Sequence, residues 1–202
     1  MANNTGAYGL CPIRHLDGSP WNGNTIPCYV SASYAVALFI GDPVLMSPTL
    51  AEMDATGTKL TINKSAGTDG TVMLGVITSF EPIDRDSNVY NPASTERIAN
   101  VCMDPTVVYK IRDDGGAVPD ATFPGSNAVL IQTAAGSTTT GLSGFHLDAG
   151  TTTAPSADQS NTLYILNMLD VPGNTLGINA EWEVLLNTNE NATGRYLGVV
   201  AA

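Results

Sequence analysis

The sequence has few charged residues, and few of these are basic. Asp, Glu, Lys and Arg make up 13% of the 202 residues, about half the share in an average globular protein. Only 8 residues are Lys or Arg, and the formal net charge is −11. Proteins bind nucleic acids and anionic membranes through clusters of basic side chains. We therefore expect protein partners, with no nucleic acid and no membrane among them.

Cysteines are scarce and apolar stretches are short. Cys11, Cys28 and Cys102 form neither a CxxC pair nor an even set, so we expect no zinc site and no disulfide framework. A local Cys11–Cys28 disulfide remains an alternative to free thiols. The longest apolar stretch, residues 35–40, is too short to cross a bilayer, and residues 1–10 do not resemble a signal peptide. These features predict synthesis in a reducing cytosol.

Amphipathic helical periodicity is also missing, and short apolar runs alternate with turn residues. The 20 glycines and 12 prolines are spread between these runs. The pattern predicts an all-β fold, either a compact β-barrel or a jelly-roll-like sandwich. Residues 67–70 are expected to close a hairpin, and Asp104-Pro105 to join two paired strands. The predicted strands are residues 29–30, 35–40, 44–46, 59–63, 72–80, 98–103, 107–112, 129–132, 162–169, 181–187 and 196–200.

The first 28 residues differ from the rest because prolines repeatedly interrupt them, yet they contain large apolar side chains. We divide the chain into an extended N-terminal arm, residues 1–28, and a β-rich domain, residues 29–202, with a further boundary conceivable near 113–128. The arm is expected to pack on its own domain or on a neighbour. A chain without residues 2–28 is expected to fold still. The candidate contact residues are Tyr8, Leu10, Ile13, Leu16 and Trp21.

The residues that could support catalysis do not form a recognisable motif. His15 and His146 are the only histidines, and Ser143 lies in GLSG rather than in a GxSxG nucleophile elbow. Glu181 and Glu183 alternate with Trp182 in a predicted strand, so both carboxylates are expected on the solvent face. We predict no catalytic residues and no enzymatic activity.

A calcium site is the remaining candidate for metal binding. Residues 84–88 (DRDSN) carry oxygen-bearing side chains at alternate positions, as calcium loops do. The EF-hand pattern then fails, because Val89 stands where glycine is required and Thr95 where a bidentate glutamate is required. A polar turn is the favoured interpretation, with a loosely built calcium site near Asp54 or Asp69 left open. No metal and no cofactor are predicted.

Six segments of the chain, taken in order, form a specific combination. They are residues 7–23 (AYGLCPIRHLDGSPWNG), 37–44 (ALFIGDPV), 75–80 (GVITSF), 90–97 (YNPASTER), 101–105 (VCMDP) and 136–144 (GSTTTGLSG), the last followed by His146-Leu147-Asp148. This combination resembles that of tailed-phage head decoration proteins, also called cement proteins. The resemblance covers most of the chain but is less distinctive after Asn161.

This resemblance implies a β-rich oligomer on the capsid exterior, made in the host cytoplasm. Its expected partners are the major capsid protein and further copies of itself, in a homotrimer. The expected role is to bridge neighbouring capsid subunits. The alternatives are a head fibre or spike base, or a carbohydrate-binding module that contacts the host surface. In that last case Trp21 and Trp182 would be stacking platforms for sugars.

Overall fold

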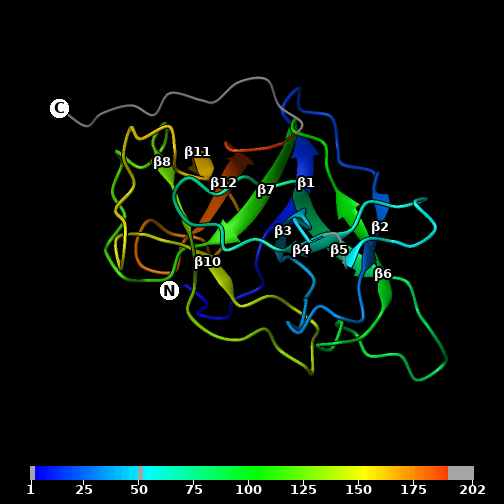
Figure 1. The fold of residues 1–202 in the computed structure, drawn as a ribbon. Coiled ribbons are helices and arrows are strands. Elements are labelled where there is room, and N and C mark those ends of the chain that lie inside the picture. The colour runs from blue at the N-terminus through cyan, green and yellow to red at the C-terminus, as the bar shows by residue number, and fades with distance from the viewer. Residues whose placement is uncertain (1–2, 50–51, 191–202) are drawn as a thin grey trace.

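The computed structural model describes residues 3–49 and 52–190, and it confirms the all-β prediction (Figure 1). No helix in these residues is long and apolar enough to cross a membrane. The strands form two five-stranded sheets and one two-stranded ribbon. They are β1 Cys11–His15, β2 Ile26–Val30, β3 Pro43–Met46, β4 Ile62–Lys64, β5 Gly75–Phe80, β6 Arg97–Cys102, β7 Val107–Arg112, β8 Asn127–Ala128, β9 Leu130–Gln132, β10 Phe145–Leu147, β11 Leu163–Met168 and β12 Glu181–Leu186.

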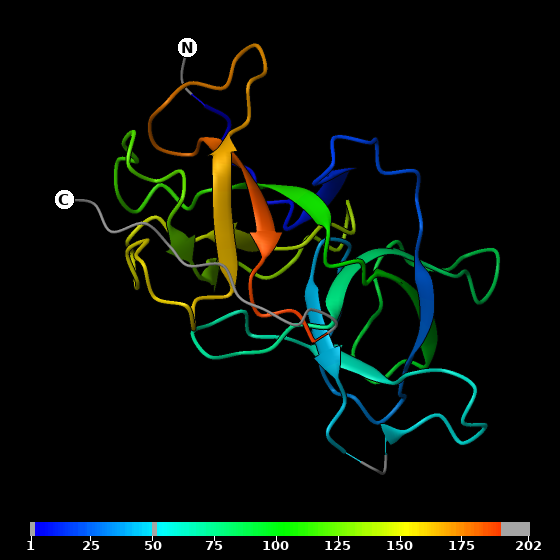
Figure 2. The same cartoon turned by 90° about the horizontal axis from the view of Figure 1, so that it is seen from above.

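One sheet closes into a small barrel. Its strand order is β2-β6-β5-β3-β4 (Figure 2). The ring closes where the chain just before β4 meets β2, because the Tyr29 N–H donates to the Leu60 carbonyl at 2.8 Å. Gly75 lies where β5 approaches β6 so closely that a Cβ would collide with the Cys102 carbonyl. The barrel core consists of Cys28, Val30, Leu38, Val44, Ile62, Leu74, Ile77, Ala99, Val101 and Met103.

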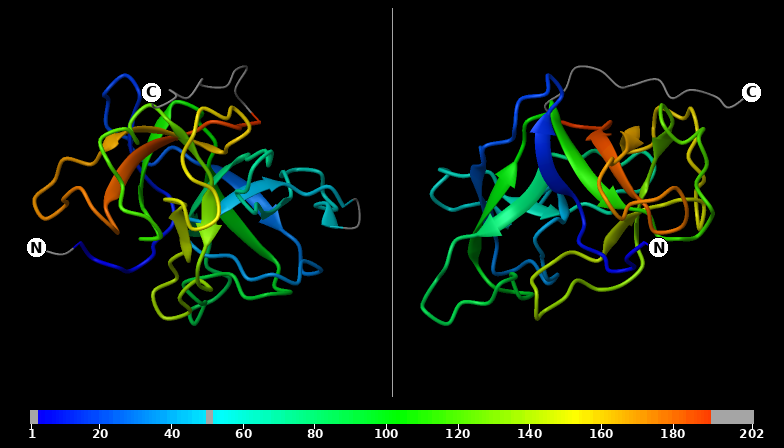
Figure 3. Two further views of the ribbon diagram at one scale, coloured as in Figure 1. Left: turned by 90° about the vertical axis from the view of Figure 1, so that its left-hand side faces the viewer. Right: turned by 180° about the vertical axis from the view of Figure 1, so that it is seen from behind.

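The second sheet has the order β1-β7-β12-β11-β8 and carries a larger core. The β9–β10 ribbon lies beside it, and an isolated bridge joins Leu147 of β10 to Asp113 just after β7. Three large aromatic side chains, Tyr109, Phe145 and Trp182, are buried in this core. Seen from behind, β1 and β7 run through the middle of the molecule, between the barrel and the rest of the larger sheet (Figure 3).

Two predicted strand pairings are wrong. The strands on either side of Asp104-Pro105 belong to different sheets, because β6 pairs with β2 and β5 whereas β7 pairs with β1 and β12. The turn at residues 67–70 does not close a hairpin either, since β4 and β5 lie on opposite sides of β3. Turn residues predict where the chain changes direction. Which strand the next strand then pairs with depends on which apolar faces can be buried together.

One predicted strand is not continuous, and one observed strand was not predicted. Residues 35–40 form no continuous strand: Leu38 and Ile40 make only isolated bridges, with Asn91 and Leu142. β1 was not predicted, because Pro12 argues against a central strand; as the outermost strand of its sheet, β1 can accommodate a proline. The strand predicted over residues 196–200 lies outside the described residues.

Candidate functional site

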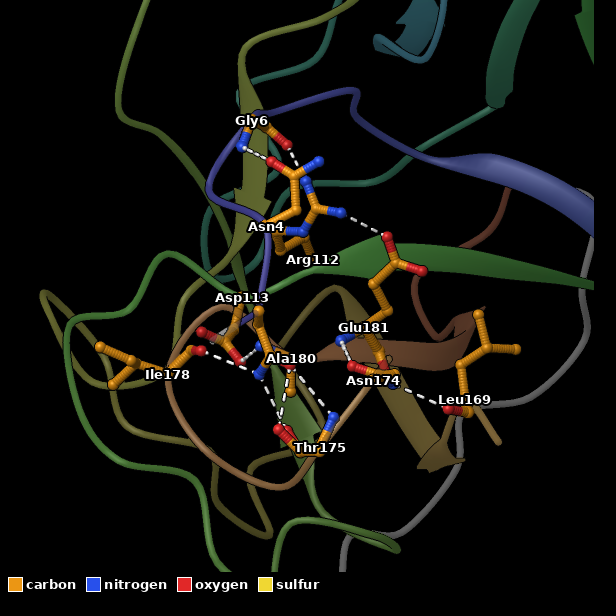
Figure 4. Close-up of polar contacts among 11 residues, drawn as sticks. Asn4, Gly6, Arg112, Asp113, Leu169, Asn174, Thr175, Ile178, Ala180 and Glu181 are labelled. Carbon is orange, nitrogen blue, oxygen red and sulfur yellow. Dashed lines mark hydrogen bonds and ion pairs between the residues drawn. The ribbon is translucent and has the colours of Figure 1, made fainter. Parts of the chain in front are cut away.

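The beginning of the described chain is attached to the larger sheet by side-chain hydrogen bonds. The Asn3 amide nitrogen donates to the carbonyls of Thr175 and Ile178 at 2.8 and 3.0 Å, and its oxygen accepts the Thr175 N–H at 3.1 Å. Both partners lie in the loop between β11 and β12, which Figure 4 shows beside Arg112 and Glu181. The segment is therefore positioned by specific contacts within its own chain.

Arg112 of β7 contacts the N-terminal segment at Gly6 and Tyr8. Its guanidinium donates to the Gly6 carbonyl and pairs with the Glu181 carboxylate at 2.5 Å (Figure 4). The Tyr8 ring lies against two cations, with the Arg112 Cζ 5.1 Å and the Lys110 Nζ 5.4 Å from its centroid. Burial, followed by the negative charge of Glu181, raises the pKa of the Tyr8 phenol far above its usual range. Tyr8 is thus held neutral as part of the fold.

The five residues predicted to contact a partner do not share one exposed surface. Leu10 is only 1% exposed and belongs to the larger core, so it is a core residue and not a partner contact. Tyr8 and Ile13 are half-buried, and Trp21 packs against the same core. Of the five, only Leu16, at 44%, is well exposed.

The proposed boundary at residue 28 also needs correction, because it falls inside β2. Within the first 28 residues, β1 pairs with β7 in the larger sheet. Of the two stated alternatives, the structure therefore has this segment packed on its own domain. Removing residues 2–28 would delete β1 and open the barrel, so that variant is now expected to unfold.

A buried carboxylate, Asp113, organises the end of the larger sheet. It accepts four N–H groups, from the backbone of Gly115, Asn179 and Ala180 at 2.9, 2.6 and 2.9 Å and from the Trp182 indole at 3.1 Å. Burial raises the pKa of this carboxyl, while the four donors oppose that shift. Asp113 was not among the residues singled out from the sequence. An acidic residue between a buried strand and Gly-Gly is a sequence signal for a carboxylate that accepts nearby N–H groups. It does not identify the donors that are distant in sequence.

A second buried carboxylate, Asp42, connects the barrel to the ribbon. It is fully buried and accepts the Ser143 hydroxyl at 2.6 Å and the Phe39 N–H at 2.9 Å. The Lys64 ammonium lies 3.2 Å from its carboxylate and 5.1 Å from the centroid of the Phe145 ring. Ser143 thus donates to a buried structural carboxylate.

The two histidines are engaged elsewhere. The His146 ring nitrogen Nδ1 lies 2.9 Å from the Thr133 hydroxyl, and burial lowers the pKa of His146. His15 Nδ1 lies 3.4 Å from the Asp104 carboxylate. The structure therefore does not bring His146 and Ser143 together as the start of a Ser–His pair.

Residues 84–88 form a polar turn that their own side chains stabilise. Asp84 Oδ1 accepts the Asp86 N–H at 3.0 Å and the Ser87 hydroxyl at 3.1 Å. Ser87 in turn accepts the N–H of Ile83. Throughout the described residues, no three His, Cys, Asp or Glu side chains are grouped closely enough to hold a metal ion.

The carboxylates beside Trp182 are not free on the solvent face, as had been expected. Glu183 is only 8% exposed and pairs with Arg14 at 2.6 Å, and Glu181 pairs with Arg112. Trp182 itself is fully buried, so it cannot serve as a stacking platform for a sugar. The carbohydrate-binding alternative therefore loses one of its two aromatic residues, and the other, Trp21, packs against the core.

All three cysteines are free thiols, so the alternative Cys11–Cys28 disulfide is wrong. Cys28 and Cys102 are buried, and burial raises the pKa of Cys28 to about 12. A thiol with so high a pKa is protonated at neutral pH and is a poor nucleophile. These side chains behave as small apolar core residues.

Comparisons of the chain with protein-family models, with curated proteins and with solved structures find no match. The buried polar clusters described above hold the fold together.

Proposed function

We propose that this chain is a structural protein of a tailed-phage virion, which decorates the capsid exterior and bridges neighbouring major capsid subunits. The observation that carries the proposal is that the polar side chains most suited to catalysis are hydrogen-bonded within the fold. Ser143, Asp42 and Asp113 are buried and bonded within the fold, as described above. What faces outward is an acidic surface with separate apolar side chains, which suits binding to another protein.

The basic residues are also used internally. Three of them form ion pairs with carboxylates, Arg97 is bonded to backbone carbonyls, and Lys110 lies against the Tyr8 ring. Among the described basic residues, only Lys59 and Arg85 lack a contact of this kind. The described surface therefore has few unpaired cations, and together with the net charge of −11 this favours a partner with a basic surface.

The resemblance to decoration proteins supports the same proposal. Several of its motif residues maintain the fold: Gly75 permits the close approach of β5 to β6, Asp42 connects the barrel to the ribbon, and Arg97 holds a long loop. We further propose a homotrimer, because an icosahedral shell offers threefold sites and symmetric self-association is common. Mass measurement in solution tests this, and a monomer or dimer contradicts it.

The direct experiment is co-sedimentation with capsids that lack this protein. The purified chain should sediment with expanded, undecorated capsids and should saturate them. Capsids that already carry the protein should bind no more, which is the matched control. Failure to bind undecorated capsids at micromolar concentrations contradicts the proposed function.

A further inference from the structure

The long loop between β5 and β6, residues 81–96, extends away from the barrel (Figures 1 and 3). At its base is a groove of about 340 Å³. Ile83, one of its lining residues, is 61% exposed and offers an apolar side chain to a partner. The groove is lined by Glu81, Pro82, Ile83, Glu96, Arg97 and Ile98.

A buried arginine fixes the shape of this loop. Arg97, only 6% exposed, donates to the carbonyls of Glu81, Asn88 and Tyr90, each at 2.8 Å. Its guanidinium also lies over the Phe80 ring, 5.2 Å from the centroid. These contacts order both ends of the loop before any partner arrives. A preorganised surface loses less conformational entropy on binding than a loose one.

The charges around the groove indicate the kind of side chain that it accepts. Glu81 and Glu96 are exposed and line the groove, and Asp84 follows Ile83 directly. The positive charge of Arg97 lies inward, and its donors are already bonded to carbonyls. An incoming Lys or Arg would therefore meet carboxylates, while a neighbouring apolar side chain could pack on Ile83.

We infer that this groove is the contact site for a basic, apolar-tipped segment of the major capsid protein. The inference rests on the proposed function and deepens it, since it moves the main contact from the N-terminal segment to the barrel. The N-terminal side chains predicted for that role are largely committed to the chain's own fold. The groove, in contrast, is exposed, ordered and matched in charge to a basic partner.

One test needs no capsid. The isotope-labelled full chain is titrated with a capped heptapeptide that alternates lysine with leucine, and with a matched peptide in which glutamate replaces lysine. The lysine peptide should shift the backbone amide signals of Glu81, Ile83 and Ile98 in nuclear magnetic resonance spectra, and the glutamate peptide should not. Equal effects of the two peptides, or shifts no larger here than elsewhere, overturn the assigned chemistry.

The second test uses capsids. Ile83→Ser should weaken co-sedimentation with undecorated capsids about tenfold, the effect of removing a central apolar contact. Val118→Ser is the matched control, because Val118 is 74% exposed and lies outside the groove, and it should change nothing. Undiminished binding of Ile83→Ser overturns the groove as the capsid contact while the proposed function stands. If the unmodified chain does not bind capsids, the proposed function and the capsid assignment both fail, and the peptide titration still decides which chemistry the groove accepts.

Discussion

The barrel and the larger sheet protect their edges in different ways. In the barrel, backbone hydrogen bonding between Tyr29 and Leu60 brings the outer strands together, and the core residues all fall within residues 28–103. The larger core collects side chains from as far apart as Leu10 and Leu186. Its outer strand β1 is covered by the following turn, where the Trp21 N–H donates to the Ile13 carbonyl. A contact between the first and last parts of the sheet closes one unit, whereas a turn next to the outer strand covers the edge of the other.

This difference has a consequence for stability. The hydrogen bonds that close the barrel join backbone groups, so the loss of one side chain leaves them in place. In the larger unit, one carboxylate satisfies four donors, and one leucine anchors the N-terminal segment. Single substitutions should therefore cost more in the larger unit than in the barrel.

The largest effect is expected for Asp113→Ala. The substitution leaves the four N–H groups without their acceptor in a buried place, which should lower the free energy of unfolding by about 4 kcal/mol. Urea unfolding of the purified variant measures this change. Asp113→Asn, which keeps the size and one acceptor oxygen, should lose less. A loss below about 1 kcal/mol for alanine would show that these donors find other partners.

A second comparison uses two leucines of the N-terminal segment. Leu10→Ala should lower the free energy of unfolding by about 3 kcal/mol, because it leaves a cavity in the larger core. Leu16→Ala should change it by less than about 0.5 kcal/mol, because Leu16 is 44% exposed. The same urea experiment measures both. Equal, small losses would mean that residues before β1 do not belong to the core.

In the barrel, Arg97→Lys is expected to have a smaller effect, about 2 kcal/mol. Lysine keeps the charge but cannot reach three carbonyls with a planar fork of donors. The loop over residues 81–96 should also become more susceptible to limited proteolysis. Arg85→Lys, an exposed change in the same loop, is the control and should leave cleavage unchanged. If the Arg97 variant is cleaved no faster, this arginine does not order the loop.

The smallest effect concerns His146. Burial lowers its pKa in the folded state, so the unfolded chain takes up the proton first as the pH falls. The contribution of His146 to stability is therefore present above the ordinary histidine pKa of about 6.5 and decreases as the pH falls below it. His146→Gln should make the free energy of unfolding less dependent on pH between about 7 and 5. An unchanged slope would contradict the assignment.

Sequence patterns predicted the all-β class and most strand positions, because short alternating or apolar runs between turn residues have few other solutions. Residues 107–112 coincide with β7, and the predicted strand over residues 181–187 contains β12. Pairing was predicted less well. The two strands around Asp104-Pro105 lie in different sheets, and nothing local in either strand encodes its neighbour.

The candidate site was harder to predict than the fold. The large apolar residues of the first 28 positions indicated burial correctly, but a sequence does not tell whether the burying surface belongs to the same chain. Leu10 shows the difference, because it fills the chain's own core. The groove at residues 81–98 gave only a weak signal, an isoleucine beside acidic turn residues. It depends on Arg97 reaching back to Glu81 and Asn88, a contact that no local pattern predicts.

The central claim is that this chain decorates a capsid, and its copy number in purified virions tests the claim most directly. Quantitative mass spectrometry gives the molar ratio of this chain to the major capsid protein. The proposed function predicts a ratio near one per capsid subunit, because a cement protein covers the whole lattice. A few copies per particle, as for a fibre or tail component, or none at all, would contradict it.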